Sequence, residues 1–102
     1  MAHSAQISAL KRKRTSIKAL CTRIKTYVDS VTQVTPESIA NLEERRERLA
    51  TYWTKYNSLQ CELEALCEDE EEDRPSFEEM FYELTAALRC RISDFTLIKN
   101  YS

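Results

Sequence analysis

Apolar side chains recur at steps of three and four residues through the first third of the chain. This spacing puts them on one face of an α-helix, and its heptad average is typical of helices that pack along a coiled-coil-like seam. Arg14 occupies the one seam position that is not apolar. The pattern predicts a helix over about residues 4–31. Its apolar positions are Ile7, Leu10, Ile17, Cys21, Ile24, Val28 and Val31.

The stretch "TQVTPES" interrupts this pattern and predicts the start of a second helix. Thr35 is a good N-cap, and Pro36 suits the first helical position, where its missing N–H costs nothing. The heptad then resumes and predicts a helix over about residues 36–67, followed by an acidic loop at 68–75. Ser76 and Glu79 have the spacing of a capping box, which predicts a third helix over about residues 76–97.

The short connection predicts an antiparallel hairpin of the first two helices, with two different flanks beside its seam. One flank carries charges, including Lys11 and Lys18 facing Glu64. The other flank is an apolar groove formed by Leu20, Tyr27, Tyr52, Leu59 and Leu66. We expect the third helix to pack in this groove. The predicted fold is therefore all-α: a single domain over residues 1–102, with a long antiparallel helical hairpin and a third, shorter helix on one side.

The third helix, at roughly 22 residues against 32, is too short to cover the whole hairpin at 1.5 Å per residue. The sequence therefore predicts an apolar patch near the hairpin turn, formed by Val28, Val31, Ile39 and Leu42. Such a patch is typical of a surface for a second copy or a partner. The alternative is that the C-terminal tail folds over it. Exchange of the third helix between two chains also stays open.

Composition narrows the class of protein further. The chain has no glycine, two prolines and 31% charged residues, as expected of long solvated helices. No apolar run is long enough to span a membrane, and we expect an intracellular protein, cytoplasmic rather than nuclear. The four cysteines form no C-x-x-C pair, His3 is the only histidine, and we interpret the cysteines as small buried side chains. We predict no catalytic residues, metal or cofactor, and hence no enzyme.

Charge is distributed unevenly along the chain. Residues 1–34 contain seven Lys/Arg and one Asp, whereas residues 68–79 contain one Arg and eight Asp/Glu. The basic side chains Lys11, Arg12, Lys13, Lys18, Arg23 and Lys25 are candidates for binding nucleic acid or another anionic surface. The favoured alternative is that the acidic run lies near the start of the first helix and neutralises them. Arg14 is expected beside Tyr56 or Gln60, with its head reaching water.

The order of these features resembles a known family. The stretches "ISALKRKRTSIKALCTRIKTYVDS", "LEERRERLATYWTKYNSLQCELEAL" and "FEEMFYELTAAL" are similar to the N-terminal region of Gag-like polyproteins of Bel/Pao-type LTR retrotransposons, over about residues 7–92. The resemblance implies a self-associating structural module that supports particle assembly, in a polyprotein fragment or a domesticated host gene. It carries no RNA-binding zinc knuckle and no protease motif.

Two other functions stay open beside this one. The first is an adaptor that offers its apolar groove to a helix of another protein. The second is a weak binder of nucleic acid or of an anionic surface through the basic first helix.

Overall fold

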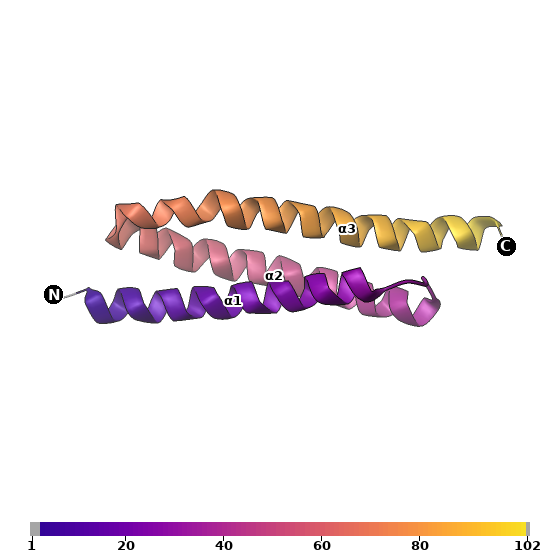
Figure 1. Cartoon of the computed structure of the whole chain (residues 1–102), viewed down its shortest axis with the longest axis horizontal. Coiled ribbons are helices and arrows are strands. Elements are labelled where there is room, and N and C mark those ends of the chain that lie inside the picture. The colour runs from indigo at the N-terminus through magenta and orange to yellow at the C-terminus, as the bar shows by residue number, and fades with distance from the viewer. Residues whose placement is uncertain (1–2, 102) are drawn as a thin grey trace.

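The computed structural model describes the backbone of residues 3–101 and the side chains of residues 3–94. Three long helices, α1 (Ser4–Ser30), α2 (Pro36–Leu66) and α3 (Asp73–Tyr101), follow one another, with a short 3-10 helix, η1 (Glu68–Glu72), before α3. Each long helix runs antiparallel to the one before it (Figure 1), so the α2–α3 connection lies beside the start of α1. The bundle measures 64 × 19 × 18 Å. The predicted all-α fold, a helical hairpin with a third helix, is confirmed.

The hairpin turn is fixed by the predicted cap. Thr35 has an extended backbone, and its hydroxyl oxygen accepts a hydrogen bond from the Ser38 N–H at 3.2 Å. The Ser38 hydroxyl in turn accepts from the Thr35 N–H at 2.7 Å. Pro36 takes the first helical position. These reciprocal bonds satisfy two backbone donors at the start of α2, which has no helical partner for them.

The predicted seam forms the core of the hairpin. Tyr56, Leu63 and Cys21 are fully buried, and burial raises the pKa of the Cys21 thiol to about 11. The expectation that all four cysteines are buried is wrong, because Cys61 and Cys90 are exposed and Cys67 is half-buried. The buried apolar side chains of the hairpin, including Val31 just after α1, are Leu10, Ile17, Cys21, Ile24, Val28, Val31, Ile39, Leu42, Leu49, Tyr56, Leu59 and Leu63.

The third helix begins earlier and ends later than the sequence predicts. It starts at Asp73 rather than at Ser76, and its 29 residues nearly match the 31 of α2. The stretch expected as an acidic loop is the 3-10 helix η1, continued directly into α3. Acidic side chains favour this position, because carboxylates interact well with the positive end of a helix dipole. The helical spacing of the sequence also puts Phe95 on the apolar stripe of this helix, but its side chain lies outside the described residues.

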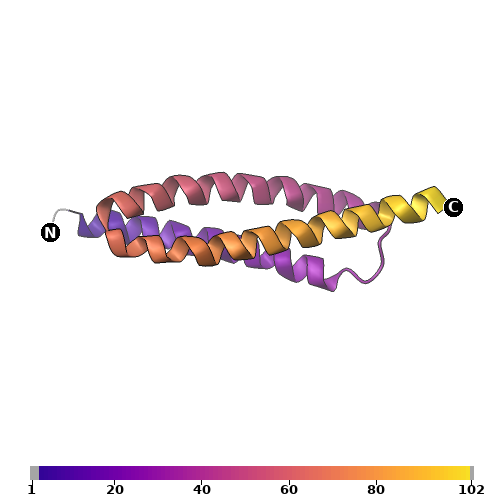
Figure 2. The ribbon, with the colours of Figure 1, turned by 90° about the horizontal axis from the view of Figure 1, so that it is seen from above.

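The apolar patch predicted near the hairpin turn is not exposed. Val28, Val31, Ile39 and Leu42 have 2%, 8%, 8% and 0% of their surface accessible and belong to the core. The physical reason is the length of α3, which at 1.5 Å per residue spans about 43 Å and reaches the turn end of the hairpin. Figure 2 shows α3 running along the hairpin to that end. These four residues are therefore core residues and do not form the exposed patch that was predicted for self-association.

Candidate helix-docking groove

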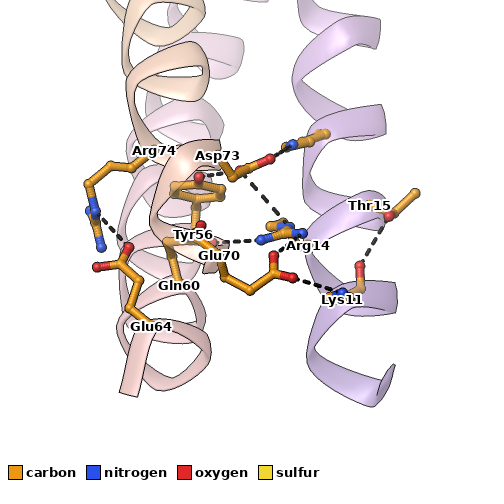
Figure 3. Close-up of polar contacts among 10 residues, drawn as sticks. Lys11, Arg14, Thr15, Tyr56, Gln60, Glu64, Glu70, Asp73 and Arg74 are labelled. Carbon is orange, nitrogen blue, oxygen red and sulfur yellow. Dashed lines mark hydrogen bonds and ion pairs between the residues drawn. The ribbon is translucent and has the colours of Figure 1, made fainter. Parts of the chain in front are cut away.

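A cluster of charged side chains fixes where α3 lies (Figure 3). Asp73, the first residue of α3, accepts hydrogen bonds from Lys18 on α1 and from the hydroxyl of Tyr56 on α2. Burial alone would raise the pKa of the Asp73 carboxyl, but these two bonds outweigh it and hold that pKa below its ordinary value. Tyr56 is shifted the opposite way, since burial and then the bond to Asp73 raise the pKa of its hydroxyl. Asp73 therefore stays charged and connects α3 to both α1 and α2.

Glu70 of η1 extends this cluster toward the start of α1. Its carboxylate pairs with Lys11 at 2.7 Å and with Arg14 at 2.9 Å. The hydrogen bond from Lys11 is the largest of the causes that lower the pKa of Glu70. Gln60, which is fully buried, accepts from Arg14 at 3.0 Å and donates to the backbone carbonyl of Glu70 at 2.6 Å. The predicted approach of Arg14 to Gln60 is confirmed, although its head pairs with Glu70 and is only 13% exposed.

Arg74 anchors the start of α3 to the outer surface of α2. Its guanidinium donates to Glu64 at 3.0 Å and to Asn57 at 2.7 Å. Asn57, Glu64 and Lys18 all belong to the charged flank of the hairpin seam. The expectation that α3 fills the apolar flank is therefore wrong, because the ion pairs of Asp73 and Arg74 draw it to the charged flank. Further along, Met80 and Leu84 of α3 lie beside Lys25 on the same flank of α1.

Aromatic stacking completes this contact between α2 and α3. The ring of Phe77 stacks on Tyr56 with a centroid distance of 3.6 Å. Trp53 stacks on Phe81 at 4.4 Å and lies 6.2 Å from Tyr82. Stacked aromatic rings bury a large apolar area and add to it a geometric preference. The charged cluster sets the position of α3, and these rings hold it there.

Because α3 occupies the charged flank, the opposite flank of the hairpin stays open as a groove between α1 and α2. One part of the groove, near the start of α1, has a volume of about 610 Å³ and runs over Leu10, Ile17 and Leu59. A second part, of about 300 Å³, lies beside Leu20 and Tyr52. The floor of the groove is apolar and its rim is charged. We refer to the two parts together as the α1/α2 groove.

The rim of the α1/α2 groove is basic. Five cationic side chains line it against two acidic ones, a net charge of +3. Within residues 3–94, no ion pair joins Lys13, Arg23 or Lys55 to a carboxylate. The charged lining residues are Lys13, Arg23, Glu44, Arg45, Arg48, Lys55 and Glu62.

Four of the five predicted groove residues lie along this open flank. Leu20, Tyr52 and Leu59 line the groove itself. Tyr27 lies at the turn end, where the guanidinium of Arg45 sits 3.6 Å above its ring. Leu66 is half-buried at the other end and packs against the core. The antiparallel pairing of like flanks thus brings these four residues onto one face, as their heptad positions indicate.

The predicted basic cluster is divided among three surfaces. Lys11 and Lys18 join the charged cluster under η1 and α3, as Arg14 does, and Lys25 pairs with Asp29 at 2.9 Å along α1. Lys13 and Arg23 face the α1/α2 groove. Arg12 is exposed between them. The six residues therefore do not form one continuous basic face.

The sequence pattern did not predict the basic side chains that α2 contributes to the rim of the groove. Arg45, Arg48 and Lys55 fall outside the seam positions, so the heptad pattern treats them as ordinary solvated charges. Their spacing was the feature that could have predicted the rim. Steps of three and seven residues keep these three cations on one face of a helix, beside Tyr52. The charges of that face, rather than its apolar side chains, would have identified the rim.

Comparisons with known proteins identify no relative. No family model matches the chain, and no curated protein or solved structure matches it either. The resemblance to Gag-like polyproteins stays a prediction. Among the described residues, no helix is long and apolar enough to cross a membrane, and no group of three or more potential metal ligands occurs.

Proposed function

We propose that this chain is a non-enzymatic interaction module whose α1/α2 groove binds one further amphipathic helix with acidic flanks. The observation that carries the proposal is the position of α3 on the charged flank, which leaves a groove with an apolar floor and a net charge of +3. A helix laid in this groove would complete a four-helix arrangement, a common way for a hairpin to bury its second flank.

The chemistry of the groove defines the helix that it would accept. The floor formed by Leu10, Ile17 and Leu59 favours a narrow stripe of apolar or aromatic side chains. The rim cations Lys13 and Lys55 favour carboxylates on either side of that stripe. A nucleic acid offers phosphates but no apolar stripe for the floor. The groove therefore favours a protein partner over RNA or DNA.

The sequence resemblance implies one use for such a module, which is self-association of a Gag-like structural protein during particle assembly. We keep it as part of the proposal, with its interface moved from the buried turn residues to the α1/α2 groove. A monomeric adaptor that binds a helix of another protein would use the same groove. The two uses share one physical requirement, which is a helix with acidic flanks.

The test uses a synthetic amphipathic peptide of about 18 residues, five helical turns long, with a leucine stripe and glutamate flanks. Its matched control has the same stripe with lysine flanks. We expect the acidic peptide to bind and to shift the backbone amide resonances of Leu20, Tyr52 and Leu59 in ¹⁵N-labelled protein. Reversal of two rim charges, Lys13→Glu with Lys55→Glu, should weaken binding by about tenfold or more, a change of roughly 1.4 kcal/mol.

A second reversal, Arg12→Glu, controls for the loss of positive charge as such. Arg12 is an exposed cation of the same helix that does not line the groove. This variant should bind the acidic peptide nearly as well as the unaltered chain. Equal affinity for both peptides, or resonance shifts confined to the α2/α3 face around Trp53, would show that the groove is not the binding site.

A further inference from the structure

The outer surface of η1 and α3 is acidic, opposite in sign to the basic rim of the α1/α2 groove. Between Glu68 and Asp94, Arg89 is the one exposed cation among the described side chains. Seven acidic side chains are exposed over the same range: Glu68, Asp69, Glu71, Glu72, Glu79, Glu83 and Asp94. Most of these carboxylates face outward. Glu83 is exposed at the edge of α3 beside Lys25 of α1, whereas Glu70 and Asp73 face the charged cluster.

This acidic surface also carries an exposed aromatic ring. Tyr82 is 60% accessible, the one large apolar side chain that is exposed among residues 3–94. It follows Glu79 by three residues and precedes Ala86 by four, so all three lie on one face of α3, with Glu83 beside them. The Tyr82 ring packs edge to face against the Phe81 ring, and the two ring centroids are 5.8 Å apart. Tyr82 is therefore held by the aromatic stack between α2 and α3. Exposed, rigidly held tyrosines are typical of the centres of protein interfaces.

The two surfaces cannot meet within one chain. The charged cluster holds α3 on the flank of Lys18, on the far side of the seam from the groove residues Leu20 and Tyr52. Two grooves facing one another would oppose like charges, and so would two α3 surfaces. Contact between the groove of one copy and the α3 surface of another opposes unlike charges. Their lengths are similar, at about 26 Å from Arg45 to Glu62 and about 23 Å from Glu79 to Asp94.

We propose that the helix which enters the α1/α2 groove is the outer face of α3 from a second copy of the chain, with Tyr82 over the apolar floor and Glu79 and Glu83 beside the basic rim. This inference rests on the proposed function of the groove. The contact is heterologous, because it joins two different surfaces. Each copy carries one groove and one α3 face, so copies join head to tail into rings or open filaments rather than closed symmetric dimers.

The test is a charge-swap experiment followed by size-exclusion chromatography with light scattering. The first variant reverses the groove, Lys13→Glu with Lys55→Glu, and the second reverses the α3 face, Glu79→Lys with Glu83→Lys. We expect the unaltered chain to form species larger than a dimer as its concentration rises over roughly a hundredfold range. Each variant alone should be monomeric, and far-ultraviolet circular dichroism should show that both remain helical.

Mixing the two variants distinguishes a head-to-tail contact from any symmetric one. In an equimolar mixture, the intact α3 face of the groove variant can enter the intact groove of the face variant, and the reversed face can likewise enter the reversed groove, because these two surfaces again carry opposite charges. The mixture should therefore grow beyond a heterodimer with the two variants alternating, whereas a symmetric contact would stop at a dimer. All four reversals in one chain should restore the larger species, and raised salt should weaken assembly because it screens these charges. The control Arg12→Glu should assemble like the unaltered chain.

Two outcomes would overturn the proposal in different ways. If the unaltered chain stays monomeric while the acidic peptide still binds the groove, the occupant is a helix of another protein, and only the further inference fails. If the chain assembles equally well with either pair of reversals, or the mixture stops at a heterodimer, then the contact between copies is not the head-to-tail one. Failure of the acidic peptide to bind would remove the proposed function as well.

Discussion

Replacement of Asp73 by asparagine isolates the charge that holds α3 in place. Asparagine has nearly the same size, and its carbonyl can still accept the hydrogen bond from the buried hydroxyl of Tyr56. The change removes the negative charge that faces Lys18 and the guanidinium of Arg14, whose Nε lies 3.9 Å away. Since the helix backbone is unaffected, any loss of stability reports on this charge.

The magnitude follows from the exposure of the partners. A hydrogen bond that involves a charged group contributes about 1.5–3 kcal/mol when it is shielded from water. The Asp73 side chain is 16% exposed, but that of Lys18 is 39% exposed, so solvent screening reduces the value. We expect Asp73→Asn to lower the free energy of unfolding by about 2 kcal/mol, which corresponds to a melting temperature about 8–16 °C lower. Asp73→Ala should cost about 1–3 kcal/mol more, because Tyr56 then loses its acceptor.

The assay combines urea unfolding followed by circular dichroism with the fluorescence of Trp53, the single tryptophan. Its ring stacks on Phe81 and lies 6.0 Å from Phe77, so its emission reports the docking of α3 on α2. The control is Asp29→Asn, which removes an exposed pair along α1 and should leave stability unchanged. A loss below about 0.5 kcal/mol for Asp73→Asn, the range of ordinary surface substitutions, would refute the argument that this charge positions α3.

Three further predictions follow from the same structure. Leu42→Ala should lower the free energy of unfolding by about 2–5 kcal/mol in chemical denaturation, because it leaves a cavity in the core; a fully folded variant of unchanged stability would show that Leu42 is a surface residue after all. Thr35→Ala should cost about 1 kcal/mol through loss of the α2 cap, a change absent in Thr32→Ala. Acid should destabilise the protein as the pH falls below about 4. The pKa values of Glu70 and Asp73 are lower in the folded chain than in the unfolded chain. These two carboxylates therefore stabilise the fold at a pH above their unfolded-state pKa values, and this stabilisation is lost as the pH falls through their folded-state pKa values. Acid titration of Glu70→Gln should show a smaller loss, and an unchanged profile would contradict the assignment.

The local structure of the hairpin follows from the order of residues along the chain. Steps of three and four between apolar residues set the seam of the hairpin, because only that spacing keeps them on one face of a helix. Thr35 and Pro36 set the turn, because the backbone donors at a helix start need a partner within a few residues. These features depend on neighbours in the chain and can be predicted without its three-dimensional arrangement. The pairing of like flanks followed from the antiparallel hairpin in the same way.

The side of the hairpin that α3 occupies was decided only by the tertiary structure. Periodicity marks one flank as apolar and the other as charged, and the hydrophobic effect alone favours the apolar flank. The position of α3 depends instead on which cations the carboxylates of Glu70 and Asp73 can contact. A carboxylate that is removed from water needs a nearby ion-pair or hydrogen-bond partner. Lys11, Arg14 and Lys18 lie next to the end of α2 only once the hairpin has formed. That three-dimensional proximity turns the acidic segment toward the charged flank and leaves the α1/α2 groove open.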